Sequence, residues 1–258
     1  MENIAQHFEA IGASLIVHPP EIRRRDRRTP DPDSWFALDV DSDRRGRERF
    51  VLRHGPTAPP LLLQHLDRPA RHLLLVSGDR RSRGRFLCGH DERHWFVAGI
   101  GEPVTTVTQA KLALVPAAIR DAVARERHRD RHHNQTFTRQ GEWFMVPASL
   151  PGALDWRTQV LRNEPITRGG RSKPHICEEL VRFGGQSVRL LGGLELTDSH
   201  FEKLDARRRG AVQLMTRNAA VYVRGRISHP DHASLFLRDW HRVFLNAEFS
   251  TSRVAFYD

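Results

Sequence analysis

Two apolar stretches, Trp35-Phe36-Ala37-Leu38-Asp39-Val40 and Arg49-Phe50-Val51-Leu52, flank the polar bend Asp41-Ser42-Asp43-Arg44-Arg45-Gly46. Alternating apolar residues on both sides of a glycine-bearing bend are typical of a β-hairpin. The pattern continues at short spacing in four further segments, residues 61–64, 73–77, 85–88 and 94–100. This regularity predicts that residues 1–104 form a β-rich lobe, either a compact antiparallel sheet or a small barrel.

A helical connector is expected to follow this lobe, over residues 105–134. Thr106 and Gln109 have the spacing of a capping box, in which each side chain bonds the backbone of the other at a helix start. Pro116 can occupy the first turn of a second helix, over residues 117–129. The charged end of that helix places the boundary between the two lobes near residue 134.

The remaining residues, 135–258, mix strand and helix signals. Ser172 is expected to cap a helix with Ile176, Leu180 and Phe183 on its inner face. Thr197 is expected to cap another helix that runs through residue 209. Strands are expected at residues 142–147, 187–196, 221–223, 234–237 and 242–246. The predicted fold class is therefore α+β: an antiparallel β-rich lobe, a helical connector and a mixed α+β lobe.

Composition places the chain among globular proteins. Of its 258 residues 39% are apolar and 28% are charged, and this length can bury a substantial core. No apolar run approaches the roughly 18 residues that a membrane helix needs, and residues 1–7 have no signal-peptide pattern. The two cysteines, Cys88 and Cys177, are too few for a disulfide framework. We therefore expect a cytoplasmic protein with no membrane partner.

The formal charge of +10 is the strongest compositional signal. Basic proteins associate with polyanions, and nucleic acid is the commonest polyanion in a cell. Lysine occurs only three times, at Lys111, Lys173 and Lys203, so arginine carries almost all the positive charge. That bias also fits a GC-rich genome, but the excess of cations over carboxylates remains. The arginine-rich stretches at residues 23–28 and 207–209 could grip phosphates or could be solvated surface.

Two short segments concentrate histidine and aspartate on predicted hairpin bends. They are Cys88-Gly89-His90-Asp91-Glu92-Arg93-His94 and His229-Pro230-Asp231-His232, and each follows an Arg-Gly-Arg triplet that suggests a duplicated unit. Imidazole and carboxylate groups gathered on turns suit a metal site or an acid–base site. We keep open a site between the lobes that is built from both turns.

A metal site could draw on both turns. On a strand, Cys88 and His90 project to the same side, and His94 can reach them from across the bend. In the second segment, a turn brings its first and fourth residues together. The candidate ligands are Cys88, His90, His94, His229 and His232, and their chemistry favours Zn²⁺. The alternative is that these bends are ordinary turns with histidines on the surface.

Without a metal, the same side chains could perform acid–base chemistry. The candidate catalytic residues are His90, His94, His229, His232 and Asp231, with Asp91 as a second carboxylate that could orient an imidazole. Paired histidines can activate water or a ribose hydroxyl and cleave RNA with no cofactor. The chain has 15 histidines, however, so chance pairings are common.

A glycine-bearing basic segment is the best candidate for binding phosphate. It consists of Arg168, Gly169, Gly170, Arg171, Ser172 and Lys173. Glycines let backbone amides converge on an anion, and the expected helix start adds positive partial charge. The spacing is not that of a Walker motif, and a flexible loop before a capped helix explains the segment nearly as well.

Three functional hypotheses follow from these residues. The leading one is a protein that binds nucleic acid, RNA or DNA, through an arginine-rich surface with phosphates near residues 168–173. The second is a nuclease or phosphodiesterase, metal-dependent or histidine-based, that uses the two histidine turns. The third is an interaction module that docks on an acidic partner protein.

Overall fold

Most of the chain folds into β-strands, with a few short helices between them. The computed structural model describes residues 4–22, 33–78, 84–129, 131–152, 160–168 and 173–248. Within these ranges the strands form four separate sheets, and none of the sheets closes into a barrel. The α+β class is therefore confirmed, and the small barrel considered for the N-terminal lobe is not found. None of the helices in these ranges combines the length and apolarity needed to cross a membrane.

The N-terminal lobe contains two sheets that face each other. Strands β1 (Leu15–Val17), β2 (Phe36–Ser42) and β3 (Glu48–His54) form a three-stranded sheet in the order β1-β3-β2. Strands β4 (Leu61–Asp67), β5 (His72–Ser77), β6 (Gly84–Asp91) and β7 (His94–Ile100) form a four-stranded antiparallel sheet. The expected hairpin is confirmed, with Val40 of β2 opposite Phe50 of β3.

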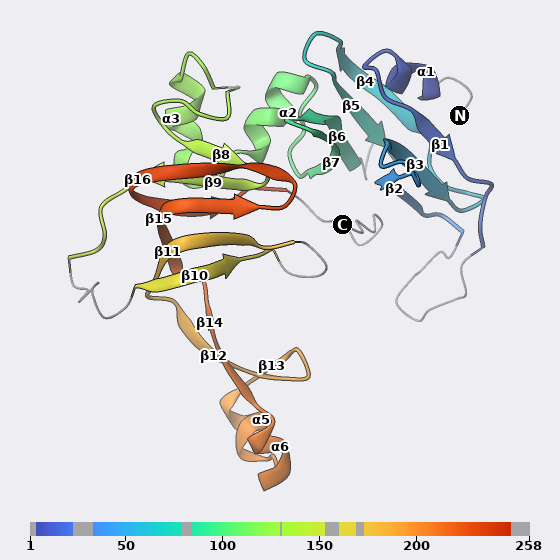
Figure 1. Cartoon of the computed structure of the whole chain (residues 1–258). Helices are drawn as coiled ribbons and strands as arrows, with labels where there is room; N and C mark the ends of the chain where they lie inside the picture. The colour runs from blue at the N-terminus through green and yellow to red at the C-terminus, as the bar shows by residue number, and fades with distance from the viewer. Residues whose placement is uncertain are drawn as a thin grey trace.

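Aromatic side chains fill the space between these two sheets. Phe36 and Phe86 meet edge to face with their ring centroids 5.3 Å apart, and Phe8 of helix α1 (Ile4–Glu9) packs on Phe50. All four rings are at most 5% exposed, so the three-stranded sheet and α1 cover one face of the four-stranded sheet (Figure 1). Burial of large aromatic rings on this scale is the main apolar contribution to the lobe's stability.

The connector consists of α2 (Val107–Leu114), a single 3₁₀ turn (Ala117–Ile119) and α3 (Arg120–Arg125). Helix α2 covers the opposite face of the four-stranded sheet, where its apolar residues pack on Leu74, Leu87 and Ala98. The capping box is confirmed, because the Gln109 amide N–H donates to Thr106 Oγ1 at 3.2 Å and the Gln109 side chain accepts from Thr106 N. The helix expected over residues 117–129 ends four residues early, because the charged residues after Arg125 offer no apolar face to bury.

A six-stranded antiparallel sheet forms the body of the C-terminal lobe. Its order is β10-β11-β15-β16-β9-β8. The bounds are β8 (Thr138–Gln140), β9 (Trp143–Pro147), β10 (Leu161–Ile166), β11 (His175–Phe183), β15 (Ala220–His229) and β16 (His232–Leu245). The side of this sheet that carries Phe144 and Phe244 packs on the connector, where Ile119 and Val123 lie. The division of the chain at residues 104 and 134 stays a prediction.

The helix expected to carry Ile176, Leu180 and Phe183 is wrong, because these residues lie on strand β11. A β-bulge between Cys177 and Glu179 shifts the register by one residue. Cys177 and Leu180, three positions apart, therefore face the same core, and the bulge imitates the spacing of a helix. Ser172, the expected cap, lies outside the described residues.

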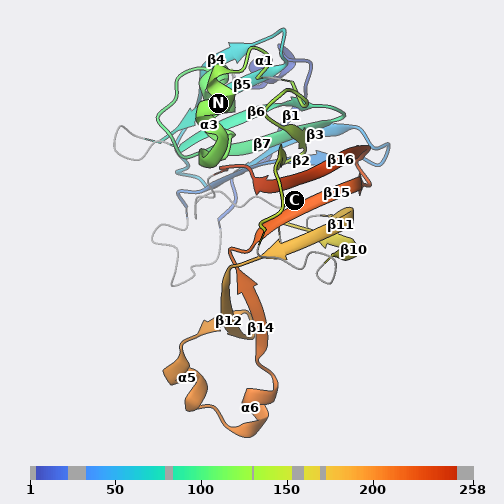
Figure 2. The same ribbon diagram turned by 90° about the vertical axis from the view of Figure 1, so that its left-hand side faces the viewer.

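An arm projects from the six-stranded sheet between β11 and β15 (Figures 1 and 2). Its sheet has the order β13-β12-β14, from β12 (Gln186–Leu191), β13 (Leu194–Leu196) and β14 (Gln213–Arg217). The cap at Thr197 is confirmed, but the expected single helix is two, α5 (Asp198–Glu202) and α6 (Ala206–Gly210). Asp205 accepts a hydrogen bond from the Arg208 amide and so starts the second helix.

Replacing Gly89 by alanine is expected to destabilise the protein by about 1–3 kcal/mol, the usual cost of overpacking a core. A Cβ at this position on β6 would lie 2.2 Å from Cδ2 of His72, whose side chain is 92% buried (8% exposed) and has little room to move. Gly152→Ala is the matched control, since nothing lies within 4 Å of its added Cβ. Urea unfolding measures both, and equal stability of the two variants would contradict the packing described for β6.

Candidate functional site

The two histidine turns meet at the boundary between the lobes. The β6–β7 turn carries Glu92 between the paired residues Asp91 and His94, and in the β15–β16 turn His229 pairs with His232. Nε2 of His94 lies 3.2 Å from the Asp231 carbonyl oxygen. Nδ1 of His232 lies 3.1 Å from Oε2 of Glu92. Turns from two different sheets, about 140 residues apart in sequence, are therefore in direct contact.

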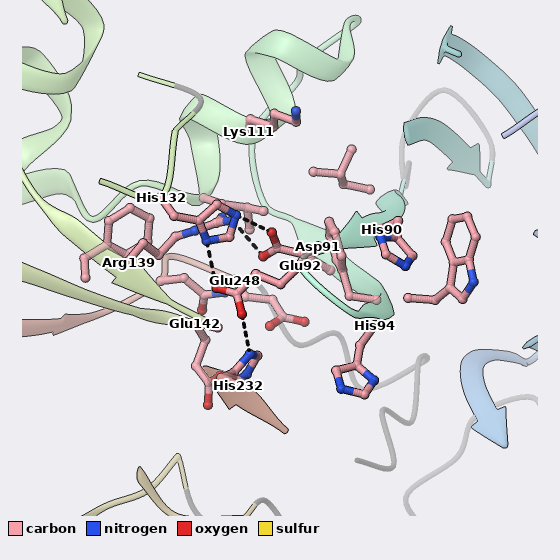
Figure 3. A pocket seen from close by; sticks show the side chains of 18 of the residues that line it. His90, Asp91, Glu92, His94, Lys111, His132, Arg139, Glu142, His232 and Glu248 are labelled. Atoms are coloured by element: carbon pink, nitrogen blue, oxygen red, sulfur yellow. Dashed lines mark hydrogen bonds and ion pairs between the residues drawn. The ribbon is translucent and has the colours of Figure 1, made fainter. Parts of the chain in front are cut away.

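A cavity of about 740 Å³ opens around this contact (Figure 3). Both turns line it, together with Lys111 of α2, Arg131 and His132 of the connector, and Glu142 of the β8–β9 turn. The cavity is thus formed by all three parts of the chain, and charged and polar residues line it together with apolar ones.

Three histidines cluster at one side of this cavity. His175, His229 and His232 each offer a ring nitrogen, and these three atoms lie within 4.8 Å of one another. The rings of His175 and His229 stack with their centroids 4.2 Å apart, and the His229 and His232 centroids are 4.7 Å apart. The sequence pattern predicts His229 and His232 as site residues. It does not predict His175, because it favours a helix where the structure has strand β11.

His175 is the most buried member of the cluster. Its exposed fraction is 1%, and neither ring nitrogen has a hydrogen-bond partner among the described residues. Each unmade hydrogen bond of a buried polar group costs about 1–3 kcal/mol. Burial, together with the charges of the neighbouring His229 and His232, lowers the pKa of His175 to about 3. The imidazole is therefore neutral at pH 7, which is the form that binds metal ions.

His229 is held by two hydrogen bonds. Its Nδ1 accepts from the Asp231 amide at 3.1 Å, and Nε2 lies 3.2 Å from the Lys173 carbonyl oxygen. Burial lowers the pKa of His229 and the nearby His232 adds to this, while the Lys173 carbonyl, Asp231 and Glu142 oppose it. A second member of the cluster is therefore neutral at pH 7.

The Glu92 carboxylate joins the cluster to the connector. Its Oε1 lies 3.1 Å from Nδ1 of His132, and its Oε2 lies 3.1 Å from Nδ1 of His232. Nε2 of His132 in turn lies 2.6 Å from Oδ1 of Asp91, and Arg139 reaches the other Asp91 oxygen at 2.7 Å. The labelled side chains of Figure 3 show this chain of contacts from Arg139 to His232.

Within this chain, the pKa of Asp91 is lowered. Burial alone would raise it, but the hydrogen bond from His132 and the charge of Arg139 outweigh that effect. Asp91 is therefore a carboxylate at neutral pH. Glu92, His132 and Arg139 were absent from the expected site residues, because nothing local in the sequence links residues 92, 132 and 139 to the second turn.

The structure does not bring Cys88, His90 and His94 into the histidine cluster. Cys88 is fully buried in the core between the N-terminal sheets, and burial raises the pKa of its thiol. His90 lines the cavity with its ring against Trp95, and burial together with the charge of Arg71 lowers its pKa. His94 is anchored at both nitrogens, by Oε1 of Glu48 at 2.5 Å and by the second turn.

The two described cations of the glycine-bearing segment are already paired. Arg168 contacts Oε2 of Glu248 at 2.6 Å, and Lys173 Nζ lies 2.8 Å from both carboxylate oxygens of Asp231. All four residues line the cavity. Gly169, Gly170, Arg171 and Ser172 lie outside the described residues, so phosphate binding by the whole segment stays a prediction.

Two other cations of the cavity are free for a ligand. Within the described ranges, the side chains of Lys111 and Arg131 make no ion pair and no hydrogen bond, although both line the cavity. An unpaired ammonium and guanidinium group in one cavity is a suitable environment for an anion.

Comparisons with protein-family models, with curated proteins and with solved structures found no match to this chain. The function is therefore inferred from the residues and geometry of the cavity and from the charge of the chain.

Removing the buried imidazole of His72, which also lines the cavity, is expected to flatten the acid dependence of stability. Burial, together with the charge of Lys111, lowers the pKa of His72 to about 4. The unfolded value is near 6.5, so between pH 6.5 and 4 the unfolded state binds the extra proton and stability is lost as the pH falls.

In His72→Phe, the free energy of unfolding should change less steeply with pH in this window, by up to about 1.4 kcal/mol per pH unit. Urea unfolding at several pH values gives the slope. His200→Phe, on the exposed helix α5, is the control and should keep the slope of the unchanged protein. A His72→Phe slope equal to that of the control would show that His72 does not titrate on unfolding.

Proposed function

We propose that this protein is a phosphodiesterase that acts on nucleic acid in the cavity between its lobes. One observation carries the proposal: the two histidine turns meet there, beside cations that have no partner among the described residues. Both features are needed for phosphodiester hydrolysis, which requires a base to activate water and positive charge to hold the phosphate.

Positive charge supports the choice of substrate class. Lys111 and Arg131 lie in the cavity, and the whole chain carries a formal charge of +10. Phosphates attract such a surface over a distance of about a Debye length, and phosphate contacts supply a large part of nucleic-acid affinity. A cavity of about 740 Å³ lies within the range of roughly 300–1,000 Å³ found for ligand sites.

His232 is the residue we assign as the general base. Its Nδ1 faces Glu92, so a proton on Nδ1 is held there and Nε2 is left with a free lone pair. The water oxygen bonds to phosphorus, and one water proton passes to Nε2 of His232. The phosphorus–oxygen bond to the leaving group breaks, and the departing oxygen takes a proton from solvent.

Lys111 and Arg131 bind the phosphate oxygens that become more negative as the water attacks. Glu92 is a positioning residue, because it touches His232 and not the phosphate. His132 lies between the carboxylates of Glu92 and Asp91, and neither His132 nor Asp91 contacts His232 directly.

Turnover of bis(4-nitrophenyl) phosphate, RNA and DNA by the full chain, with Zn²⁺ added, tests this function. We expect His232→Ala to lower kcat/KM by roughly 100-fold or more, the usual contribution of a positioned base. Lys111→Ala should weaken binding of a single-stranded oligonucleotide and reduce the slope of log affinity against log salt by about one. His200→Ala, on the arm and outside the cavity, should change neither.

Other outcomes of the same measurements would assign the chain differently. Salt-dependent binding with no turnover of any substrate would overturn the phosphodiesterase and leave a nucleic-acid-binding protein. If the protein shows no binding and no turnover, both the phosphodiesterase and the nucleic-acid-binding hypotheses are overturned. Docking on an acidic protein would then be the remaining hypothesis.

A further inference from the structure

We propose that His175, His229 and His232 bind a Zn²⁺ ion at the side of the interlobe cavity, with Glu92 as the carboxylate that orients His232. The inference deepens the proposed phosphodiesterase and rests on it for the role of the ion. A bound Zn²⁺ would take Nε2 of His232 as a ligand and would itself activate the attacking water, so His232 serves as the base only in the metal-free protein. Its structural basis and its test need no substrate.

The burial of His175 is the first reason. An imidazole with 1% exposure on the interior strand β11 has two ring nitrogens and no hydrogen-bond partner in the described part of the chain. Buried polar groups in folded proteins nearly always have a partner. A metal ion held with the two neighbouring histidines would satisfy one of these nitrogens.

The spacing of the three nitrogens is the second reason. They lie within 4.8 Å of one another, and tetrahedral Zn²⁺ with bonds of about 2.0–2.1 Å needs separations of about 3.4 Å. Zinc binding would close the cluster by up to about 1.4 Å, with the movement made by His229 and His232, which are partly exposed. His229 gives up one hydrogen bond in doing so, either to the Asp231 amide or to the Lys173 carbonyl oxygen.

The partner of His232 is the third reason. Histidine ligands of zinc commonly donate their second ring N–H to a carboxylate, which fixes the ring and strengthens its binding. Glu92 stands in this position, 3.1 Å from Nδ1 of His232, and leaves Nε2 for the ion. Nδ1 of His132 lies 3.1 Å from the other oxygen of Glu92, so residues of the four-stranded sheet and of the connector both lie next to this ligand of the six-stranded sheet.

The ligand set also indicates the type of site. Three imidazole ligands leave one coordination position of a tetrahedral ion open, as in catalytic rather than structural zinc sites. Two of the three ligands, His229 and His232, line the same cavity as Lys111 and Arg131, two cations whose side chains have no ion pair and no hydrogen bond among the described residues.

Zinc titration of the full chain tests the site. The protein is purified without a histidine tag and stripped with a chelator, and Zn²⁺ is then titrated in competition with a chromophoric chelator. We expect one ion per chain. His175→Ala, His229→Ala and His232→Ala should each weaken binding at least 100-fold, and Glu92→Gln should weaken it 10- to 100-fold. Co²⁺ in place of Zn²⁺ should give the intense visible absorption of a tetrahedral site.

Two matched variants distinguish this ligand set from others. His90→Ala removes a cavity histidine that lies outside the cluster, and His200→Ala removes one on the arm; both should bind Zn²⁺ as the unchanged protein does. If His90→Ala weakens binding as much as His232→Ala, the assigned ligand set is wrong. The absence of a bound ion in the unchanged protein would overturn the site.

Folding of the variants is checked by thermal melting in chelator and in excess Zn²⁺. Zinc should raise Tm of the unchanged protein, because only the folded chain holds the site, and should not raise Tm of the ligand variants. If His175→Ala does not fold, His229→Gln and His232→Gln, at partly exposed positions, carry the test. Zinc binding without turnover would refute only the phosphodiesterase, and turnover without zinc binding would refute only the metal site.

Discussion

The Glu92 carboxylate is the contact on which the site depends, because its two oxygens meet histidines from the connector and from the C-terminal lobe. Glu92 itself has a φ of +48°, a left-handed conformation that is uncommon for residues other than glycine. Glu92 lies in the two-residue turn between β6 and β7, where hairpins commonly need a positive φ. Without this carboxylate, His132 and His232 would each lose a neighbouring carboxylate, and the contact between the two turns would be left to His94 and Asp231.

Much of the fold could be predicted because its signals are local. The hairpin of β2 and β3, the strands β4 to β7 and the capping box of α2 each depend on residues close in sequence, and all are found. The error at β11 has a local cause too: the bulge near Glu178 places Cys177 and Leu180 on one face, which a sequence pattern reads as a helical turn. Because strand β11 is predicted as a helix, the sequence does not place His175 near the histidine turns.

The site could be predicted only in part. Histidine-rich turns indicated His229 and His232, but the same reasoning included Cys88, because the alternation of a strand places it on the side of His90. That side of β6 is apolar core at residue 88 and cavity wall at residue 90, a difference set by the sheets packed against it. The role of Glu92 depends on His232, which is 140 residues away in the sequence, and local spacing patterns cannot predict so distant a contact.

The separation of the two turns also determines when the site can exist. His94 and Asp231 are 137 residues apart, and at about 5–20 residues per second a ribosome needs roughly 7–27 s to cover that interval. Throughout it, the finished N-terminal sheets present Asp91 and Glu92 with no C-terminal hairpin to meet. The β15–β16 ladder is made last, and only then can its turn meet the β6–β7 turn and complete the cavity.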